Sequence, residues 1–260
     1  MGRVHLFEFH ELEWFPATLR DLLTDFLSFY AGAFKPYVPV APLLADALES
    51  TGTQRIVDLC SGAGRPVLSL RPALERRGLS DLEVILTDKF PNLESWRVAA
   101  EENLDAVKFV RMPVDAADVP GHLKGFRTLF TSFHHFCPGE AREILADAVT
   151  KNEGIGVFEY TERNWLVWTL PTLLIPLVVW LCTPFIRPFR WDRLVWTYLV
   201  PVVPLVALWD GFVSNLRTYS VAELRRLLDR LEGSCYTWRV GTVRSLGLSR
   251  ITYVVGVPRS

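Results

Sequence analysis

The sequence predicts an α/β fold that holds a nucleoside-containing cofactor at the ends of its strands, and two stretches predict it. In the first, a short apolar strand ends at Asp58 and runs into the glycine-rich turn Ser61–Gly64, after which a helix begins. Glycine has no Cβ, so such a turn lets the backbone approach a ligand closely. In the second, the strand Val84–Asp88 also ends in an acid. A carboxylate at that position can accept both hydrogens of a ribose diol.

The turn departs from the pattern of a dinucleotide site. That fingerprint, G-x-G-x-x-G, uses its third glycine for tight packing of the helix on the strand. Val67 stands at that position here, and Pro66 lies in the first helical turn. Asp58 precedes the glycines, where a carboxylate would repel a pyrophosphate but attract a cationic ligand such as an aminoacyl sulfonium. The residues therefore favour a sulfonium nucleoside over a nicotinamide dinucleotide.

At these residues the chain resembles the class I S-adenosylmethionine (SAM)-dependent methyltransferases. Their first motif, D/E-x-G-x-G-x-G, matches Asp58 to Gly64, with the small residue Cys60 in place of the first glycine. Thr87–Phe90 resembles the second motif, which implies that Asp88 holds the ribose hydroxyls. Val114–Ala116 is similar to the segment whose acid contacts the adenine amine, although Asp118 competes with Asp115 for that role. The cofactor residues implied are Asp58, Cys60, Ser61, Gly62, Gly64, Asp88, Lys89, Asp115, Ala116 and Ser132.

The remaining strands follow in the family's order. They are Val107–Arg111, Phe126–Phe133, Gly156–Tyr160, Tyr236–Val240 and Ile251–Val255, with a helix from Ala141 to Val149. The last two strands resemble the family's closing antiparallel pair. The resemblance covers about residues 50–160 and 214–257. It implies a Rossmann-like, seven-stranded, mostly parallel sheet with an antiparallel C-terminal hairpin.

Candidate catalytic residues follow the fourth and fifth strands. Methyl transfer from a sulfonium is an in-line displacement, so the protein has chiefly to align the nucleophile and exclude water. His134 and His135 are similar to a histidine pair that many members carry, and an imidazole can remove the acceptor's proton. We expect at least one of them to face the site; the alternative is a packed histidine that supports the loop. Glu159 and Tyr160 are further candidates, for which a structural contact is the alternative.

Two helices are expected before the sheet, one opening at Pro16 and one running from Pro42 to Gly52. They either cover the substrate mouth or cap the sheet. Close to the N-terminus, His5 and His10 stand near glutamates in an arrangement that imitates a metal site. Their aromatic and charged surroundings are typical of an ordinary surface segment, so we assign no metal.

Composition indicates one compact domain with an insertion. The net charge is −1 and no run is rich in lysine or arginine, which argues against a nucleic-acid partner. The four cysteines are scattered without a C-x-x-C pair, so neither a zinc site nor a disulfide framework is expected. We found no signal peptide, and a cytoplasmic location is the expectation. We divide the chain into an N-terminal helical cap (1–50), a SAM-binding α/β core (51–163), a hydrophobic insertion (164–213) and a C-terminal helix and hairpin (214–260).

The insertion carries two uncharged apolar runs, Trp165–Ile186 and Leu194–Trp209, separated by the arginine-containing segment Arg187–Arg193. The first run is long enough to span a bilayer core of about 30 Å. Prolines interrupt both runs, however, and the arginines would lie on the wrong side for a two-pass span. Two interpretations remain. The insertion is a broken hairpin peripheral on the inner face of the membrane, with its arginines at lipid phosphates, or it is a hydrophobic lid or homodimer interface.

Beyond the insertion, the stretch Asp210–Tyr219 reads as a polar loop that faces the substrate or forms a hinge. Ser220 and Glu223 then form a capping box that opens a helix ending at Gly233. The sequence as a whole predicts a methyltransferase that acts on a small-molecule or lipid-like acceptor. An NAD(P)-dependent oxidoreductase and a membrane-docked SAM-binding protein without catalysis are the alternatives.

Overall fold

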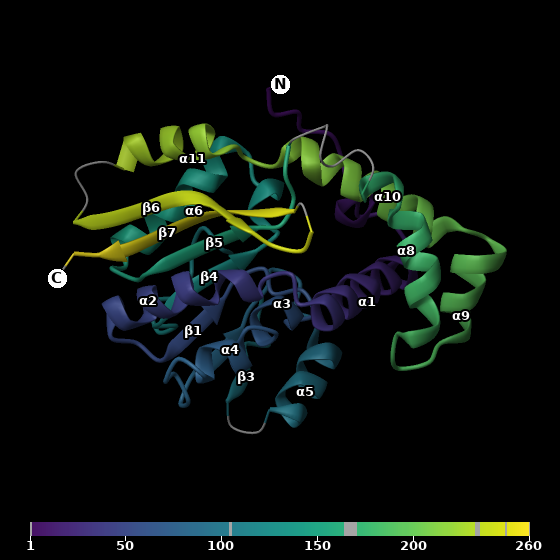
Figure 1. Cartoon of the computed structure of the whole chain (residues 1–260), viewed down its shortest axis with the longest axis horizontal. Coiled ribbons are helices and arrows are strands. Elements are labelled where there is room, and N and C mark those ends of the chain that lie inside the picture. The colour runs from purple at the N-terminus through teal and green to yellow at the C-terminus, as the bar shows by residue number, and fades with distance from the viewer. Residues whose placement is uncertain (1, 104–105, 164–170, 232–234, 248, 260) are drawn as a thin grey trace.

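Seven strands form one sheet at the centre of the molecule (Figure 1). The structure is a computed structural model, and it describes residues 2–103, 106–163, 171–231, 235–247 and 249–259. The strand order is β3-β2-β1-β4-β5-β7-β6. The strands are β1 (Arg55–Asp58), β2 (Glu83–Leu86), β3 (Val107–Phe109), β4 (Phe126–Phe130), β5 (Ile155–Glu159), β6 (Tyr236–Arg244) and β7 (Arg250–Pro258).

The first five strands run parallel, and β7 runs antiparallel to both β5 and β6. This confirms the predicted fold class, including the antiparallel C-terminal hairpin. In register, Asp58 of β1 lies between Leu86 of β2 and Thr128 of β4. The carboxyl ends of the parallel strands therefore meet at one edge of the sheet, where ligands bind in open α/β sheets.

Helices cover both faces of the sheet. They are α2 (Ala41–Thr51), α3 (Arg65–Leu68), α4 (Arg71–Glu75) and α5 (Leu93–Glu102) on one face, and α6 (Pro138–Thr150) and α11 (Val221–Leu228) on the other. Ile56 of β1 packs into the first layer, whereas its neighbour Val57 packs into the second. Successive strand residues point to opposite faces, so burial of both faces explains why the strands are apolar throughout.

A third core joins the N-terminal helix to the insertion. Leu22 and Phe26 of α1 (Ala17–Phe34) pack with Val179 of α8 (Ile175–Cys182) and with Val203 of α10 (Val202–Arg217). The helix expected to open at Pro16 is thus present and buries one apolar face, although Leu27 on the same helix is exposed. Together with α9 (Trp191–Leu194), these helices form the helical lobe at one end of the molecule (Figure 1). The two N-terminal helices thus have different partners, since α2 packs on the sheet.

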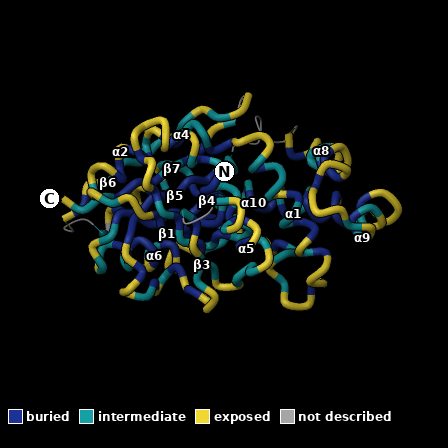
Figure 2. The backbone as a smooth tube through the Cα atoms, turned by 90° about the horizontal axis from the view of Figure 1, so that it is seen from below, coloured by how far each residue is buried: buried dark blue, intermediate teal, exposed yellow. Residues whose placement is uncertain are grey.

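The insertion folds as a broken helical hairpin. No single helix of the described residues is long and apolar enough to cross a bilayer; Trp191–Leu199 and Val202–Arg217 reach that length and composition only as a pair, bent by 74°. Trp165 and Trp168, at the start of the first apolar run, lie outside the described residues. Figure 2 shows buried positions in the central sheet and exposed positions around the periphery, α8 and α9 included.

The chain leaves β4 earlier than predicted. The strand ends at Phe130, and Phe133–His135 form a 3-10 helix, so the prediction of a strand through Phe133 is wrong at its end. The backbone turns at Thr131, which has a φ of 44°. The carboxylate of Glu159 then accepts the amides of Ser132 and Phe133 at 3.0 and 2.7 Å, which diverts them from the sheet.

The polar stretch after the insertion is also different from the prediction. Helix α10 continues through Asp210 to Arg217, so the expected loop over most of this stretch is wrong. Its polar side chains lie on one helical face and are buried against the N-terminal segment, which stabilises the helix. The capping box of Ser220 and Glu223 is confirmed at the start of α11. That helix ends at Leu228 with a 3-10 turn to Leu231, and the predicted end at Gly233 lies outside the described residues.

Candidate functional site

The glycine-rich turn follows β1 in a conformation that favours glycine. Gly62 and Gly64 have φ values of 54° and 77°. A Cβ on Gly64 would lie 2.8 Å from Cδ1 of Leu86, so only glycine fits there. Cys60, where the family has its first glycine, also has a positive φ, of 54°. The indole of Trp96 on α5 donates to the Gly62 carbonyl at 2.8 Å and so fixes the turn.

Asp88 connects this turn to the end of β2. Its Oδ2 accepts the Gly62 amide at 2.9 Å, and its Oδ1 accepts the Phe90 amide at 2.9 Å. A carboxylate has about four acceptor positions, so each oxygen keeps one for a further donor. Burial raises the pKa of Asp88. The Asp88 carboxylate is therefore fixed against the glycine-rich turn and can still accept hydrogen bonds from a ligand.

Asp58 is a buried carboxylate held by hydroxyl groups. Its side chain accepts the Thr128 hydroxyl at 2.6 Å, and its main-chain carbonyl accepts the hydroxyls of Ser61 and Thr87 at 2.8 Å each. Burial raises the pKa of Asp58 to about 7, and the nearby charge of Asp88 adds to this effect. The end of β1 thus holds a carboxyl group that would ionise more readily beside a cation.

The third predicted segment reaches the same edge. The Val114 amide donates to the Asp88 carbonyl at 2.9 Å, and Nζ of Lys89 lies 3.3 Å from Oδ2 of Asp115. Ala116 is buried directly after it. Asp118, the competing acid, instead pairs with Lys151 at 3.0 Å. The structure therefore places Asp115 and Lys89 beside the turn.

Ser132 and Cys60 complete this edge. Both follow strand ends, Ser132 after β4 and Cys60 after β1. The Ser132 hydroxyl is buried and has no hydrogen-bond partner among the described residues. Burial raises the pKa of the Cys60 thiol, which therefore stays neutral. All ten predicted cofactor residues thus follow β1, β2, β3 or β4 at their carboxyl ends.

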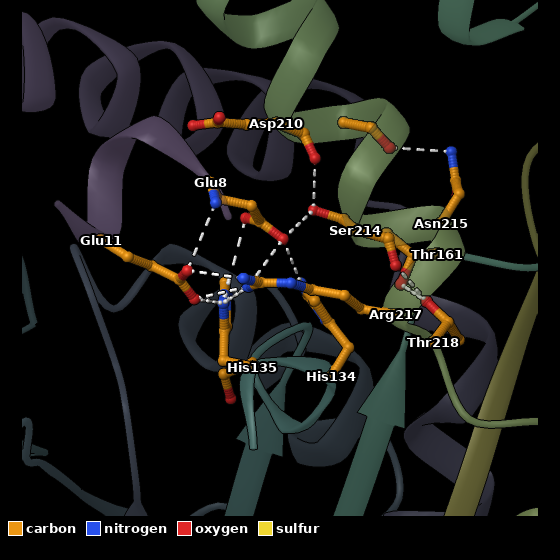
Figure 3. A network of polar contacts seen from close by, with 12 residues as sticks. Glu8, Glu11, His134, His135, Thr161, Asp210, Ser214, Asn215, Arg217 and Thr218 are labelled. Carbon is orange, nitrogen blue, oxygen red and sulfur yellow. Dashed lines mark hydrogen bonds and ion pairs between the residues drawn. The ribbon is translucent and has the colours of Figure 1, made fainter. Parts of the chain in front are cut away.

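The histidine pair is held by carboxylates (Figure 3). Nδ1 of His134 lies 2.6 Å from Oε2 of Glu159, and Nδ1 of His135 lies 2.6 Å from Oε1 of Glu11. Burial opposes the charged form of His134, but the carboxylates of Glu159 and Glu8 outweigh it and raise its pKa. Burial and the charge of His134 lower the pKa of His135 to about 3. Among the described residues, the Glu159 carboxylate contacts His134, the amides of Ser132 and Phe133 and the Thr161 hydroxyl, so it positions the histidine.

Arg217 joins this network to the insertion. Its guanidinium donates to Glu11 at 2.6 and 2.8 Å and to Glu8 at 3.2 Å (Figure 3). Glu8 is 1% exposed, and burial raises its pKa. Asp210 of α10 accepts the Phe9 amide at 2.7 Å and lies 3.0 Å from Nδ1 of His10. The N-terminal segment, the loop after β4 and helix α10 therefore meet in one polar cluster.

Tyr160, the last of the predicted catalytic residues, follows β5 and lies in an aromatic group away from the histidine pair. Its hydroxyl is 3.3 Å from that of Tyr30 on α1 and 3.4 Å from Oγ of Ser249. Its amide donates to the Thr131 hydroxyl, which also contacts the Tyr37 hydroxyl at 2.5 Å. Tyr160 thus connects the lobe to the turn after β4 and to the hairpin.

No family model and no curated protein matches the chain. Solved structures do match it. The plantazolicin methyltransferase BpumL in complex with SAH is 10% identical, with 93% of this chain and 98% of that chain covered and a TM-score of 0.53. A second structure of BpumL, with a monoazolic desmethylPZN analog and SAH, is 11% identical over the same shares, with a TM-score of 0.52. This chain has the fold of the SAM-dependent methyltransferases.

Within this fold the predicted cofactor residues gather at one edge of the sheet, whereas most of the polar cluster was not predicted. His10, expected in an ordinary surface segment, is 35% exposed, and its ring also pairs with the buried Asp210. A signal was present in the sequence. Asp210, Ser214 and Arg217 recur at helical spacing directly after an apolar run, and this is the pattern of one polar helical face.

Proposed function

We propose that this protein is a SAM-dependent methyltransferase. The observation that carries the proposal is the Asp88 carboxylate, which is bonded to the Gly62 amide and keeps acceptor positions free. A ribose placed over the glycine turn would present its two hydroxyls to those positions. Asp58, at the end of the neighbouring strand, offers negative charge for the sulfonium or the ammonium of the same ligand.

The topology of the sheet argues against the dinucleotide alternative. The dinucleotide-binding fold has the strand order 3-2-1-4-5-6, built from parallel repeats. Here β7 enters antiparallel between β5 and β6. Together with Val67 in place of the third glycine, this order favours a sulfonium nucleoside over NAD(P).

Chemistry at this site would consist mainly of alignment. The sulfonium already activates the methyl group, so the protein has to place the acceptor in line and keep water out. An acceptor that loses a proton also needs a base, for which His134 and His135 are the candidates. Tyr160 lies near the same strand ends and would contact the acceptor rather than the cofactor.

Titration calorimetry with SAM and with NAD tests this proposal directly. We expect one SAM to bind per chain and NAD not to bind. Labelled SAM incubated with fractionated small-molecule and lipid extracts then tests for transfer. Binding of NAD but not SAM would overturn the proposal, and SAM binding without transfer to any fraction would favour the non-catalytic alternative.

For the acceptor, we propose a lipid-like molecule that the protein meets while it is peripheral on the inner face of a membrane. The support is the apolar surface of the insertion. Its large exposed apolar side chains are Leu173, Leu174, Leu177, Trp180, Leu181, Phe185, Phe189, Trp191, Val195, Tyr198, Leu199, Val200, Leu205 and Phe212. Many large exposed apolar side chains in one lobe are typical of a contact with a membrane or another protein.

Fewer arginines of the segment Arg187–Arg193 are free to contact lipid phosphates than predicted. Arg193 is buried and pairs with Asp25 at 2.5 Å, and Arg190 pairs with Asp192 at 2.6 Å. The prediction that all three arginines contact lipid phosphates is therefore wrong, and Arg187 is the exposed one of the three. A groove of about 320 Å³, lined by Leu177, Trp180, Leu205, three prolines and Thr197, opens on the lobe.

Vesicle pelleting with anionic and neutral lipids tests the membrane proposal. The change is Trp191→Ser with Leu199→Ser, since these side chains are 75% and 76% exposed and their loss leaves the core intact. We expect wild type to pellet and the double variant to remain in solution. Phe90→Ser, at an 82% exposed position outside the lobe, is the matched control and should pellet. A wild-type protein that stays in solution and sediments as a dimer would support the homodimer alternative instead.

A further inference from the structure

The polar cluster of Figure 3 contains ligand atoms suited to a metal ion. Glu8, His134 and His135 each offer one such atom, and these atoms lie within 4.8 Å of one another. Nε2 of His134 is 3.7 Å from Oε1 of Glu8, and Nδ1 of His135 is 3.9 Å from Oε2 of Glu8. An ion with bonds of about 2.1 Å holds tetrahedral ligands about 3.4 Å apart. The two distances run to different oxygens of Glu8. Nδ1 of His135 also contacts Glu11 at 2.6 Å and Arg217 at 3.3 Å, so an ion would take the place of those contacts.

The Nε2 atom of His134 is the independent sign of a ligand. The His134 side chain is 2% exposed, and Nε2 has no hydrogen-bond partner in the part of the chain that the structure describes. Its distance of 3.7 Å from Glu8 is too long for a hydrogen bond. A buried polar atom without a partner is costly and rare in native proteins. A bond to an ion at this position would remove that cost.

The other nitrogen of His134 is arranged as in known metal sites. Its Nδ1 is paired with Glu159 at 2.6 Å, and Glu159 is fixed by two main-chain amides. Metal-bound histidines commonly donate their second ring N–H to a carboxylate, which sets the tautomer and directs the free lone pair to the ion. Glu159 therefore acts as a positioning residue for His134.

Charge balance in the cluster also favours a cation. Four carboxylates converge here, those of Glu8, Glu11, Glu159 and Asp210. Among the described residues they pair with one guanidinium, that of Arg217, and with the imidazoles of His134 and His10. Arg217 makes its shortest contacts with Glu11, at 2.6 and 2.8 Å, and a longer one of 3.2 Å with Glu8. The charge of Glu8 is thus only partly balanced, and a divalent ion would complete it.

A second group, Glu8, His10 and Asp210, meets the same distance criterion. That group has no counterpart to Nε2 of His134, since none of its ligand atoms is among the buried side-chain atoms that lack a partner in the described part of the chain. We propose that Glu8, His134 and His135 bind a divalent first-row transition-metal ion. Two imidazoles and a carboxylate suit Zn²⁺, Fe²⁺ or Mn²⁺, and three protein ligands leave a coordination position open. In that state Nε2 of His134 cannot act as a base.

The test begins with the full-length wild-type protein, stripped with a chelator and dialysed against Zn²⁺ or Co²⁺. We expect one equivalent of metal by elemental analysis and, for Co²⁺, the visible absorption of an imidazole-ligated ion. Glu8→Gln should lose the stoichiometric metal. Glu159→Gln should weaken metal binding about 10–100-fold, because the carboxylate that holds the proton on Nδ1 of His134 is lost.

The exposed His122 provides the matched control, since His122→Gln removes an imidazole far from the cluster and should bind as wild type does. His134→Gln is informative where it folds, and Glu8→Gln carries the test where it does not. Wild-type protein without a stoichiometric equivalent of either ion would overturn the proposal. Unchanged affinity in Glu8→Gln would overturn it as well. Neither result bears on SAM binding, which is measured separately.

Discussion

Asp58 makes the stability of the folded protein depend on pH in a defined direction. Burial raises its pKa to about 7, from an ordinary value of 3.8. The folded state therefore keeps the proton after the unfolded chain has lost it. The stability that this group contributes is present below about pH 4 and is lost as the pH rises to about 7. With about 1.4 kcal/mol per pKa unit, the loss is at most about 4 kcal/mol.

The measurement compares wild type with Asp58→Asn in urea unfolding at about pH 5 and about pH 8. The asparagine oxygen can still accept the Thr128 hydroxyl, so the variant removes titration while keeping the shape. We expect the free energy of unfolding of the variant, minus that of wild type, to increase between about pH 5 and about pH 8. All other titrating groups are common to both proteins and cancel. A difference that stays constant over this range would refute the reasoning.

The same group makes cofactor binding depend on pH in the opposite direction. A sulfonium nucleoside beside Asp58 stabilises the ionised form, so SAM affinity should rise with pH up to about 7 and then level off. Below that point it should fall by up to about tenfold per pH unit. Asp58→Asn should bind SAM weakly at every pH. A wild-type affinity that does not change with pH would place the cation away from this carboxylate.

Three further predictions test other parts of the site. Asp88→Ala should weaken SAM binding by about 1–3 kcal/mol in calorimetry, because the ribose hydroxyls lose their acceptors, whereas Asp118→Ala should not. Gly64→Ala should lower the free energy of unfolding by roughly 1–3 kcal/mol in urea, because its φ of 77° is unfavourable with a Cβ that would also meet Leu86. Arg217→Met should cost about 3–5 kcal/mol in the same assay, because it leaves buried carboxylates without their cation. Unchanged stability in either of the last two would contradict the contacts described.

The fold was predictable because its signals are local. The strand ending at Asp58, the glycines that follow and the acid at Asp88 are read within short windows of sequence. The arrangement of the strands was implied by the resemblance to the class I methyltransferases. Boundaries were less accurate, as at Phe133, because a carboxylate from β5 redirects the chain there.

The polar cluster was not predictable for the opposite reason. Glu8, His134 and Arg217 are separated by more than eighty residues along the chain, and no local pattern connects them. Charged residues near an N-terminus and polar residues after an apolar run are each typical of solvent-exposed segments. Only the tertiary packing of α10 against the N-terminal segment shows that these side chains are buried together.

The shared core of α1 and the insertion has a consequence for synthesis of the chain. Helix α1 leaves the ribosome early, whereas α8 begins at Ile175 and α10 at Val202. At about 5–20 residues per second, the apolar face of α1 waits roughly 10–30 s for its partners. During this interval the nascent chain presents an uncovered apolar helix, which makes it a ready client for a ribosome-associated chaperone.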